Sequence, residues 1–219
     1  MAQLAEATYR FARELLPDRR KIKYGDLDYD MDHSVDTTRS NVSLRAQFIA
    51  ALTGHQYFPT EPWLFDEMMS ALPIRFQDFT FVDLGSGKGR VLLMAAQYGF
   101  KRIIGVEYMP EWHRSAQENI GKFVASNPSA PLIDSLCMDA RDFDFSDGPL
   151  VIYFFNPFPK PVLAAVLDRL RRSVLKGLRP VFLAYRYPEF EELLRNCGWL
   201  EKIAGTEQWA VWKNRRDRA

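Results

Sequence analysis

Three glycines stand at alternate positions in the stretch FVDLGSGKGR, directly after a run of apolar residues. Gly85, Gly87 and Gly89 would let the backbone turn sharply and approach a ligand closely. A phosphate-binding loop requires the spacing G-x-x-x-x-G-K-[ST], and a dinucleotide fingerprint requires G-x-G-x-x-G. The segment reads G-x-G-x-G, so it fits neither spacing. Glycines in such a turn could also serve the turn alone.

Three acidic residues lie where they could contact the same ligand. Glu107 ends the apolar segment RIIGVE, about 20 residues after the glycines, where an acid can accept hydrogen bonds from ribose hydroxyls. Asp83 brings negative charge to the head of the glycine turn, near a possible ligand amino group. Asp139 could accept a hydrogen bond from an adenine amino group. These groups suit a ligand with a cation, a ribose and a purine, although Glu107 could be an ordinary strand-end acid and Asp139 part of a solvated loop.

Alternating strands and helices would position these residues. Strands are expected at residues 79–84, 102–107, 135–140, 149–155, 180–186, 199–205 and 207–213, and helices at residues 90–98, 110–125, 160–175 and 188–197. Near-continuous apolar strands are typical of a parallel sheet covered by helices on both faces. The last two strands are too close for a helical crossover, so they form an antiparallel hairpin. The sequence predicts a doubly wound α/β fold with a seven-stranded, mostly parallel sheet.

The amino-terminal part of the chain is expected to form a helical arm. Residues 3–16 have an amphipathic helical pattern that stops at Pro17, residues 18–41 are polar without a clear period, and residues 42–52 are again helical. We expect residues 1–58 to form an arm that gates the substrate, and residues 59–219 to form the ligand-binding domain, which opens with a short helix at 62–72.

The motifs VDLGSGKG, GVE, MDARDF and FFNPF, in this order within residues 79–213, resemble the class I S-adenosylmethionine-dependent methyltransferases. The resemblance implies a Rossmann-like fold and S-adenosylmethionine as the cofactor. In this family the glycine turn shapes the methionine pocket; Glu107 would hold the ribose, and Met138 and Asp139 would flank the adenine. The implied cofactor-binding residues are Thr60, Asp83, Gly85, Ser86, Gly87, Gly89, Glu107, Tyr108, Met138, Asp139 and Asn156.

The segment NPFP follows the fourth expected strand and resembles the [N/D]-P-P-[Y/F/W] loop of methyltransferases that act on nucleobase or glutamine nitrogens. It has one proline fewer before the aromatic ring. The resemblance implies that Asn156 accepts hydrogen bonds from NH groups of the methyl acceptor, and that the ring of Phe158 packs along the methyl path. The same residues could merely break the chain between a strand and a helix.

The segment YFPTEP resembles the Y-x-P-T-x-P stretch of a subgroup that includes protein lysine methyltransferases. By this resemblance, Thr60 would lie near the methionine end of the cofactor and Tyr57 could close over the site. The expected catalytic residues are thus Asn156, Phe158 and Tyr57. The alternative is a proline-rich linker that packs on the sheet.

The sequence therefore favours a methyltransferase that acts on a nitrogen of a protein side chain or a small amine. One alternative is an O-methyltransferase of a small metabolite, which would need a general base such as His33 or Tyr185. Another is a non-catalytic nucleoside-binding or scaffold module. The glycine spacing disfavours a nicotinamide-dependent oxidoreductase.

Composition restricts the partners. The net charge of +1 gives no sign of a polyanion-binding protein, so a nucleic-acid partner is not expected, and no run approaches the roughly 20 apolar residues of a membrane span. The two cysteines lack metal-ligand spacing, so we expect no metal site and a cytoplasmic protein. Lys88 and Arg90 are expected to be exposed, and the five tryptophans to lie chiefly in the core. No feature favours a particular oligomeric state.

Overall fold

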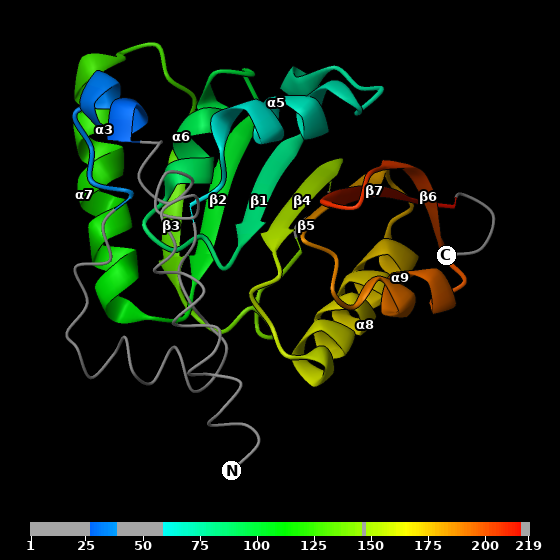
Figure 1. Cartoon of the computed structure of the whole chain (residues 1–219). Coiled ribbons are helices and arrows are strands. Elements are labelled where there is room, and N and C mark those ends of the chain that lie inside the picture. Colours follow the sequence, from blue (N-terminus) through cyan, green and yellow to red (C-terminus); the bar gives the residue numbers. More distant parts are fainter. Residues whose placement is uncertain (1–26, 39–58, 146–147, 216–219) are drawn as a thin grey trace.

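A computed structural model describes residues 27–38, 59–145 and 148–215 (Figure 1). Its strands are β1 (Thr80–Leu84), β2 (Arg102–Glu107), β3 (Ile133–Cys137), β4 (Leu150–Phe155), β5 (Val181–Arg186), β6 (Leu200–Gly205) and β7 (Trp209–Asn214). Its helices are α3 (Leu27–His33), α5 (Pro62–Ser70), α6 (Arg90–Ala96), α7 (Pro110–Ser126), α8 (Lys160–Lys176), α9 (Glu191–Asn196) and the short 3₁₀ helix η1 (Phe76–Asp78). The helices expected at 3–16 and 42–52 lie outside the described residues.

The seven strands form a single sheet in the order β3-β2-β1-β4-β5-β7-β6. Strands β1 to β5 run parallel to one another, whereas β7 is antiparallel to both β5 and β6. The predicted Rossmann-like fold with a carboxy-terminal antiparallel hairpin is confirmed. Because the strand order reverses between β1 and β4, the carboxyl ends of these two strands mark the place where open α/β sheets bind ligands.

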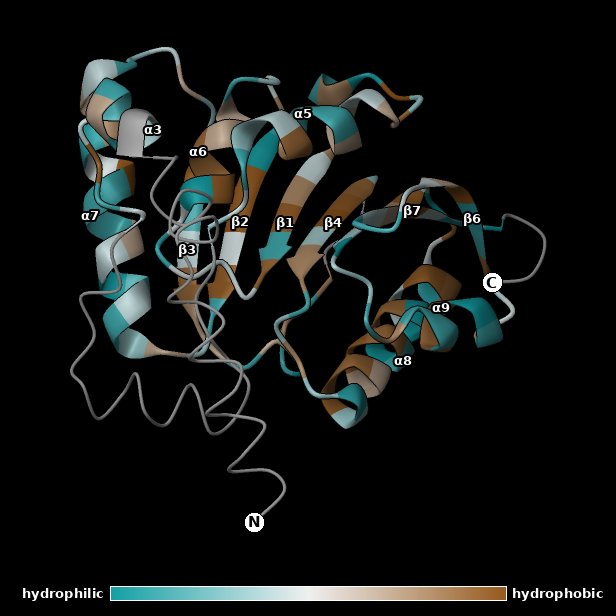
Figure 2. Cartoon of the chain, in the orientation of Figure 1, coloured by the Kyte–Doolittle hydropathy of each residue, from teal (hydrophilic) through white to brown (hydrophobic). Residues whose placement is uncertain are grey.

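Helices cover both faces of the sheet (Figure 1). The buried side chains of α5, α6 and α7 pack on one face together with Tyr29 and Val35 from the amino-terminal segment. Helices α8 and α9 pack on the other face, together with Phe143 and Phe145 from the chain segment that leads from β3 to β4. The central strands are mostly apolar along their length, as Figure 2 shows, because both of their faces are buried.

Prolines mark the starts of three of these helices. Pro62 and Pro110 occupy the first position of α5 and α7, and Pro161 the second position of α8. Proline is tolerated there because its missing N–H would have no partner within the helix. Within the described residues, no helix is both long and apolar enough to cross a bilayer.

Two local predictions are wrong. Residues 27–33 were expected to be irregular, but they form α3, which ends where Ser34 adopts φ 54° and Val35 N donates to the Asp30 carbonyl. Strand β3 ends at Cys137 instead of residue 140. The Asp139 carboxylate accepts a hydrogen bond from Arg141 N at 2.8 Å, a turn geometry that competes with strand pairing.

Candidate active site

The glycine turn connects β1 to α6. Gly85, Gly87 and Gly89 have φ angles of 84°, 53° and 86°, which other residues rarely adopt. Gly85 N and Ser86 N both donate to the Val106 carbonyl of β2, at 2.8 and 3.1 Å. The turn is thereby held against the end of the neighbouring strand.

Glu107 is buried at the end of β2 and binds the glycine turn directly. Its carboxylate accepts hydrogen bonds from Gly87 N and Met109 N, both at 2.8 Å. Burial raises the pKa of Glu107 above its ordinary value, although these backbone hydrogen bonds oppose the shift. Each carboxylate oxygen has a second lone pair, so the group can still accept hydrogen bonds from a ligand.

Asp83, 2% exposed at the end of β1, receives no hydrogen bond from the described part of the chain. Burial raises its pKa well above the ordinary value, and the nearby charge of Glu107 adds to the shift. A buried carboxylate without a partner is costly, and a cation beside it would remove that cost.

The turn after β4 contacts the glycine turn. A Cβ placed on Gly85 would lie 2.5 Å from the Cβ of Pro157. The Ser86 side chain points the other way, because a Cβ on Gly105 of β2 would lie 2.7 Å from its Oγ. The Ser86 hydroxyl therefore faces β2 and not the turn after β4.

Thr60 lies buried beside the same strands. Its Oγ1 and the Tyr153 hydroxyl are 2.6 Å apart, and Tyr153 of β4 pairs with Asp83 of β1 in the sheet register. Burial raises the pKa of the Tyr153 phenol, so this group is a neutral hydrogen-bonding partner at neutral pH. The structure thus brings Thr60 to the place where the strand order reverses.

Asn156 is half-buried and held on both sides of its amide. Its Oδ1 accepts a hydrogen bond from the Tyr185 hydroxyl at 2.8 Å, and its Nδ2 donates to Glu189 Oε2 at 2.6 Å. Phe190 N donates to the Tyr185 oxygen at 3.2 Å, so the tyrosine proton is directed at Asn156. Asn156 also has a positive φ of 39°, which asparagine tolerates better than most residues.

The remaining expected site residues lie around these groups. Met138 and Phe158 are half-buried and pack on the α8 face of the sheet. Asp139 accepts bonds from the Arg141 guanidinium, which lowers the pKa of Asp139. Tyr108 is exposed directly after Glu107, and Tyr57 lies outside the described residues.

Two expectations about exposure are wrong. Lys88 and Arg90 are only 2% and 1% exposed, because acidic and hydroxyl side chains from residues 30–38 bind them. Trp63 is 60% exposed at the start of α5, whereas Trp199, Trp209 and Trp212 are in the core as expected.

The two bases suggested for oxygen methylation are differently placed. The ring of His33 packs against Tyr29 and Phe123, on the α7 side of the sheet. Tyr185 lies beside Asn156, but burial raises its pKa to about 12, and its hydroxyl donates to the asparagine.

Sequence reasoning missed Tyr153, Glu189 and Asn119 as site residues. Tyr153 had a weak signal, because it places a hydroxyl in the apolar run LVIYFF. Glu189 and Asn119 had no such signal. The partner of Glu189 is 33 residues away in the chain, and the partners of Asn119 are 31 and 83 residues away.

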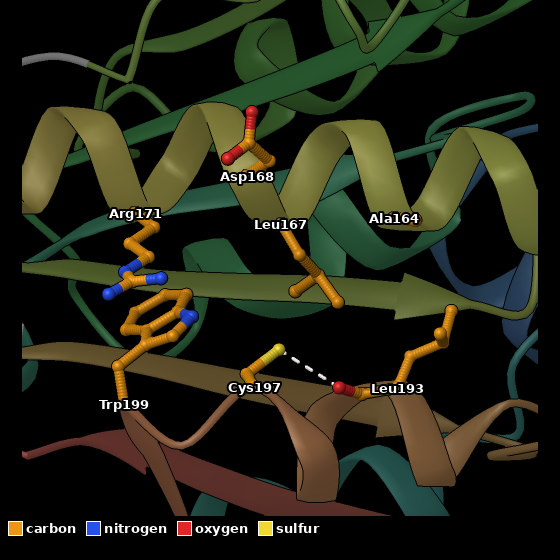
Figure 3. A pocket seen from close by; sticks show the side chains of 7 residues that line it. All are labelled: Ala164, Leu167, Asp168, Arg171, Leu193, Cys197 and Trp199. Carbon is orange, nitrogen blue, oxygen red and sulfur yellow. Dashed lines mark hydrogen bonds between the residues drawn. The ribbon is translucent and has the colours of Figure 1, made fainter.

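A small cleft of about 170 Å³ lies between α8 and α9 (Figure 3). It is below the roughly 300 Å³ of ordinary small-molecule sites. Cys197 faces it, but burial raises the pKa of this thiol, and its S–H donates to the Leu193 carbonyl at 2.9 Å. The raised pKa favours the protonated thiol over the reactive thiolate, and we assign this cleft no function.

Comparisons with known proteins agree with the fold. Residues 81–177 match the family model described as a methyltransferase domain. No curated protein matches the chain. The precorrin-6y C5,15-methyltransferase of Geobacter metallireducens GS-15 has a similar structure, with a TM-score of 0.53 and 17% identity over 74% of this chain and 92% of that one.

Two further structures are named for nucleic acids. The 23S rRNA methyltransferase ErmE has a TM-score of 0.51 at 12% identity, over 73% of this chain and 70% of its own. A predicted N6-adenine-specific DNA methylase from Listeria monocytogenes str. 4b F2365 has a TM-score of 0.52 at 14% identity, over 72% of this chain and 51% of its own. These likenesses concern the fold, and they do not support the expectation that a nucleic-acid acceptor is excluded.

The residues at the crevice fit S-adenosylmethionine. The unpartnered carboxylate of Asp83 suits the amino group of the cofactor, and Glu107, already in contact with the glycine turn, can accept from ribose hydroxyls. When bound, the cofactor supplies an activated methyl group on a sulfonium. The methyltransferase domain matched over residues 81–177, the Rossmann-like fold and these residues together support a class I S-adenosylmethionine-dependent methyltransferase.

Proposed function

We propose that this methyltransferase acts on a nitrogen, in a protein side chain or a small amine, and that Asn156 receives that nitrogen. The observation that carries the proposal is the oriented amide of Asn156. Tyr185 and Glu189 hold this amide at the end of β4, and Pro157 beside it contacts Gly85 of the cofactor turn. A nitrogen presented there would lie next to the methyl donor.

The hydrogen bonds of the amide favour an N–H donor as its ligand. Because the Glu189 carboxylate accepts from Nδ2, it polarises the amide and increases the negative partial charge on Oδ1. Tyr185 takes one lone pair of Oδ1 and leaves the other for the acceptor. A nitrogen gains positive charge as it is methylated, and a preorganised oxygen stabilises that charge.

The cofactor end of the proposed site uses other residues. Asp83 would hold the amino group, Glu107 the ribose, and Met138 with Asp139 the adenine, while Ser86, Gly87 and Gly89 would contribute backbone. Thr60, bonded to Tyr153, would border the methionine end, and Phe158 would pack along the methyl path. Tyr108 would border the mouth of the site. We assign Tyr57, and the part of residues 1–58 outside residues 29–38, a role in closing over the acceptor.

Methylation of an oxygen is the weaker candidate. An oxygen acceptor usually requires a general base with a pKa near the working pH. Tyr185, with a pKa of about 12, stays protonated at neutral pH, and His33 is packed against two aromatic rings on the other face of the sheet.

A tritiated-methyl transfer survey tests the proposal. Lysate labelled with wild-type enzyme is separated into protein, nucleic-acid and small-molecule pools, and the labelled product is identified by mass spectrometry as an N-methyl amine, an O-methyl ether or an O-methyl ester. We expect an N-methyl product in the protein or small-amine pool. Label confined to nucleic acid would contradict the proposed acceptor class, and an O-methyl product would contradict nitrogen as the target.

Asn156→Ala provides the matched test. We expect labelling of the wild-type product to fall about 100-fold, because one preorganised donor or acceptor in a transition-state site has an effect of this size. The affinity for S-adenosylhomocysteine, measured by isothermal titration calorimetry, should fall far less than the labelling does. Asn127→Ala, which removes an asparagine at the end of α7, is the control and should leave both values unchanged.

A further inference from the structure

Two buried cations lie in the segment that leads from the glycine turn into α6. Lys88 and Arg90 are almost fully buried, and a buried charge is costly unless it is paired and hydrogen-bonded. Their partners come from residues 29–38, which we call the strap and which includes the end of α3. The strap precedes the glycine turn by about 50 residues, so the pairing is tertiary.

The strap surrounds the Arg90 guanidinium. Arg90 Nε donates to Thr37 Oγ1 at 2.8 Å, and Nη2 donates to Thr38 Oγ1 at 2.7 Å and approaches Asp30 at 3.3 Å. The Tyr29 ring lies 4.8 Å from the guanidinium carbon, a cation–π distance. Lys88 Nζ lies 3.5 Å from the Asp36 carboxylate.

The strap is also ordered within itself. The Asp30 carboxylate accepts hydrogen bonds from Thr37 N at 3.0 Å, from Thr38 N at 2.7 Å and from the Thr37 hydroxyl. Burial disfavours the charge of Asp30, but these bonds and the Arg90 charge outweigh it and lower the pKa of Asp30. The strap therefore presents its side chains to the two cations in one fixed arrangement.

Asn119 of α7 links the strap to the glycine turn through the backbone. Its Oδ1 accepts from Asp36 N, and its Nδ2 donates to both the Asp36 carbonyl and the Lys88 carbonyl, all at 3.0 Å. Lys88 directly follows Gly87, whose N–H binds Glu107. One buried amide thus joins the strap to the part of the turn that meets the ribose-binding acid.

We propose that the strap is part of the cofactor-binding machinery: by holding Lys88, Arg90 and the Lys88 carbonyl, it fixes the glycine turn in its binding shape. Asn119, Asp36 and Thr38 are then positioning residues that act through the turn. Strap docking and cofactor binding favour each other, because coupling between two sites is reciprocal. This inference rests on the cofactor and is independent of the methyl acceptor.

Calorimetric titration with S-adenosylhomocysteine tests the coupling in the full-length protein. Thr38→Val removes one hydroxyl partner of Arg90 and keeps the side-chain shape, and Asp36→Asn removes the charge that faces Lys88. We expect each to weaken binding on the order of fivefold to tenfold. Asp168→Asn, which removes an exposed ion pair with Arg172 on α8, is the control and should not change the affinity.

A second readout separates this role from a purely structural one. In the unliganded Thr38→Val variant, the amide hydrogens of Gly87 and Gly89 should exchange faster than in the wild type. If the thermal midpoint falls while affinity and these exchange rates stay unchanged, the strap contributes only to the stability of the fold, and the proposal is wrong. Weaker binding with unchanged glycine exchange would also overturn it, because the strap would then act by direct contact.

The wild-type protein provides a test that needs no substitution. We expect S-adenosylhomocysteine to slow hydrogen exchange at the amides of Asp36, Thr37 and Thr38, since ligand binding should stabilise the docked strap. Unchanged exchange at these three amides, at saturating ligand, would contradict the reciprocal coupling.

Discussion

The turns after β1 and β4 meet at Gly85 and Pro157, yet they are built differently. The glycine turn is buried except at Gly85 and is held by charged groups, with Glu107 on one side and the strap on the other. The turn with Asn156 is half-buried and held by Tyr185 and by the exposed Glu189. In the proposed account, cofactor binding uses the first of these turns, called the rigid turn, and the acceptor is admitted at the second, called the open turn.

Gly85→Ala should have the largest effect, because it alters the contact between the two turns. The new methyl group would overlap Pro157, and the positive φ of 84° would add about 1–2 kcal/mol of backbone strain. We expect affinity for S-adenosylhomocysteine and methyl transfer each to fall about 100-fold or more.

Gly99→Ala is the matched control. Gly99 has a similar φ of 70°, and a Cβ there would meet no atom within 4 Å. It should lower the free energy of unfolding by about 1–2 kcal/mol and leave cofactor affinity unchanged. Equal effects of the two substitutions on affinity would show that strain alone, and not the contact between the turns, is responsible.

Tyr185→Phe and Glu189→Gln test the open turn separately. Each removes one partner that orients the Asn156 amide, so we expect about tenfold slower methyl transfer with unchanged S-adenosylhomocysteine affinity. In an Asn156→Ala background the same substitutions should have no further effect on the rate. Additive effects would mean that neither residue acts through Asn156, and Tyr187→Phe on the exposed neighbour serves as the control.

The buried carboxyl groups of Asp83 and Glu107, which border the rigid turn, predict that stability and ligand binding depend on pH. The pKa values of Asp83 and Glu107 are raised in the folded protein, so protonation of these two carboxyl groups stabilises the fold. This stabilisation is fully present below the ordinary carboxyl pKa of about 4. It is lost as the pH rises through the raised pKa values. An ammonium group beside Asp83 favours the ionised form. S-adenosylhomocysteine binding should therefore release a fraction of a proton and strengthen as pH rises through this window.

Calorimetry in buffers of different ionisation enthalpy measures this release. Asp83→Asn should abolish most of it, since asparagine does not titrate. Proton uptake on binding by the wild-type protein would contradict the assignment of Asp83 to the cofactor amino group.

The smallest effect is expected at Asp139, which shares its carboxylate with Arg141. Asp139→Asn should weaken S-adenosylhomocysteine binding about fivefold, the equivalent of one hydrogen bond of roughly 1 kcal/mol. The analogue with hypoxanthine in place of adenine has an acceptor oxygen where adenine has its amino group. The asparagine variant should bind this analogue better than the wild type does; the opposite order would remove Asp139 from the adenine site.

The two turns also differ in what the sequence predicts. The glycine spacing, Glu107 and the apolar strands are local patterns, so the fold could be predicted from them, and they also carry the proposed position of the cofactor. The burial of Lys88 and Arg90 could not, because their partners are 52 to 60 residues earlier in the chain. The hydrogen bonds of Asn156 could not be predicted either, because its two partners follow 29 and 33 residues later in the chain.

Helix α3 and the end of β3 were missed for a related reason. The sequence DYDMDH has no apolar period, and the partners that bury Tyr29 and Asp30 include the guanidinium of Arg90 from a distant segment. Strand β3 was expected to continue because of its apolar residues, whereas the turn at Asp139 ends it.

A crystal structure of the complex with S-adenosylhomocysteine tests the central claim most directly. We predict that the ligand lies outside the carboxyl ends of β1 and β4, with both ribose hydroxyls within hydrogen-bond distance of Glu107, the amino group beside Asp83, and the sulfur facing Asn156. A crevice filled by protein side chains, or a Glu107 carboxylate turned away from the ribose, would contradict it.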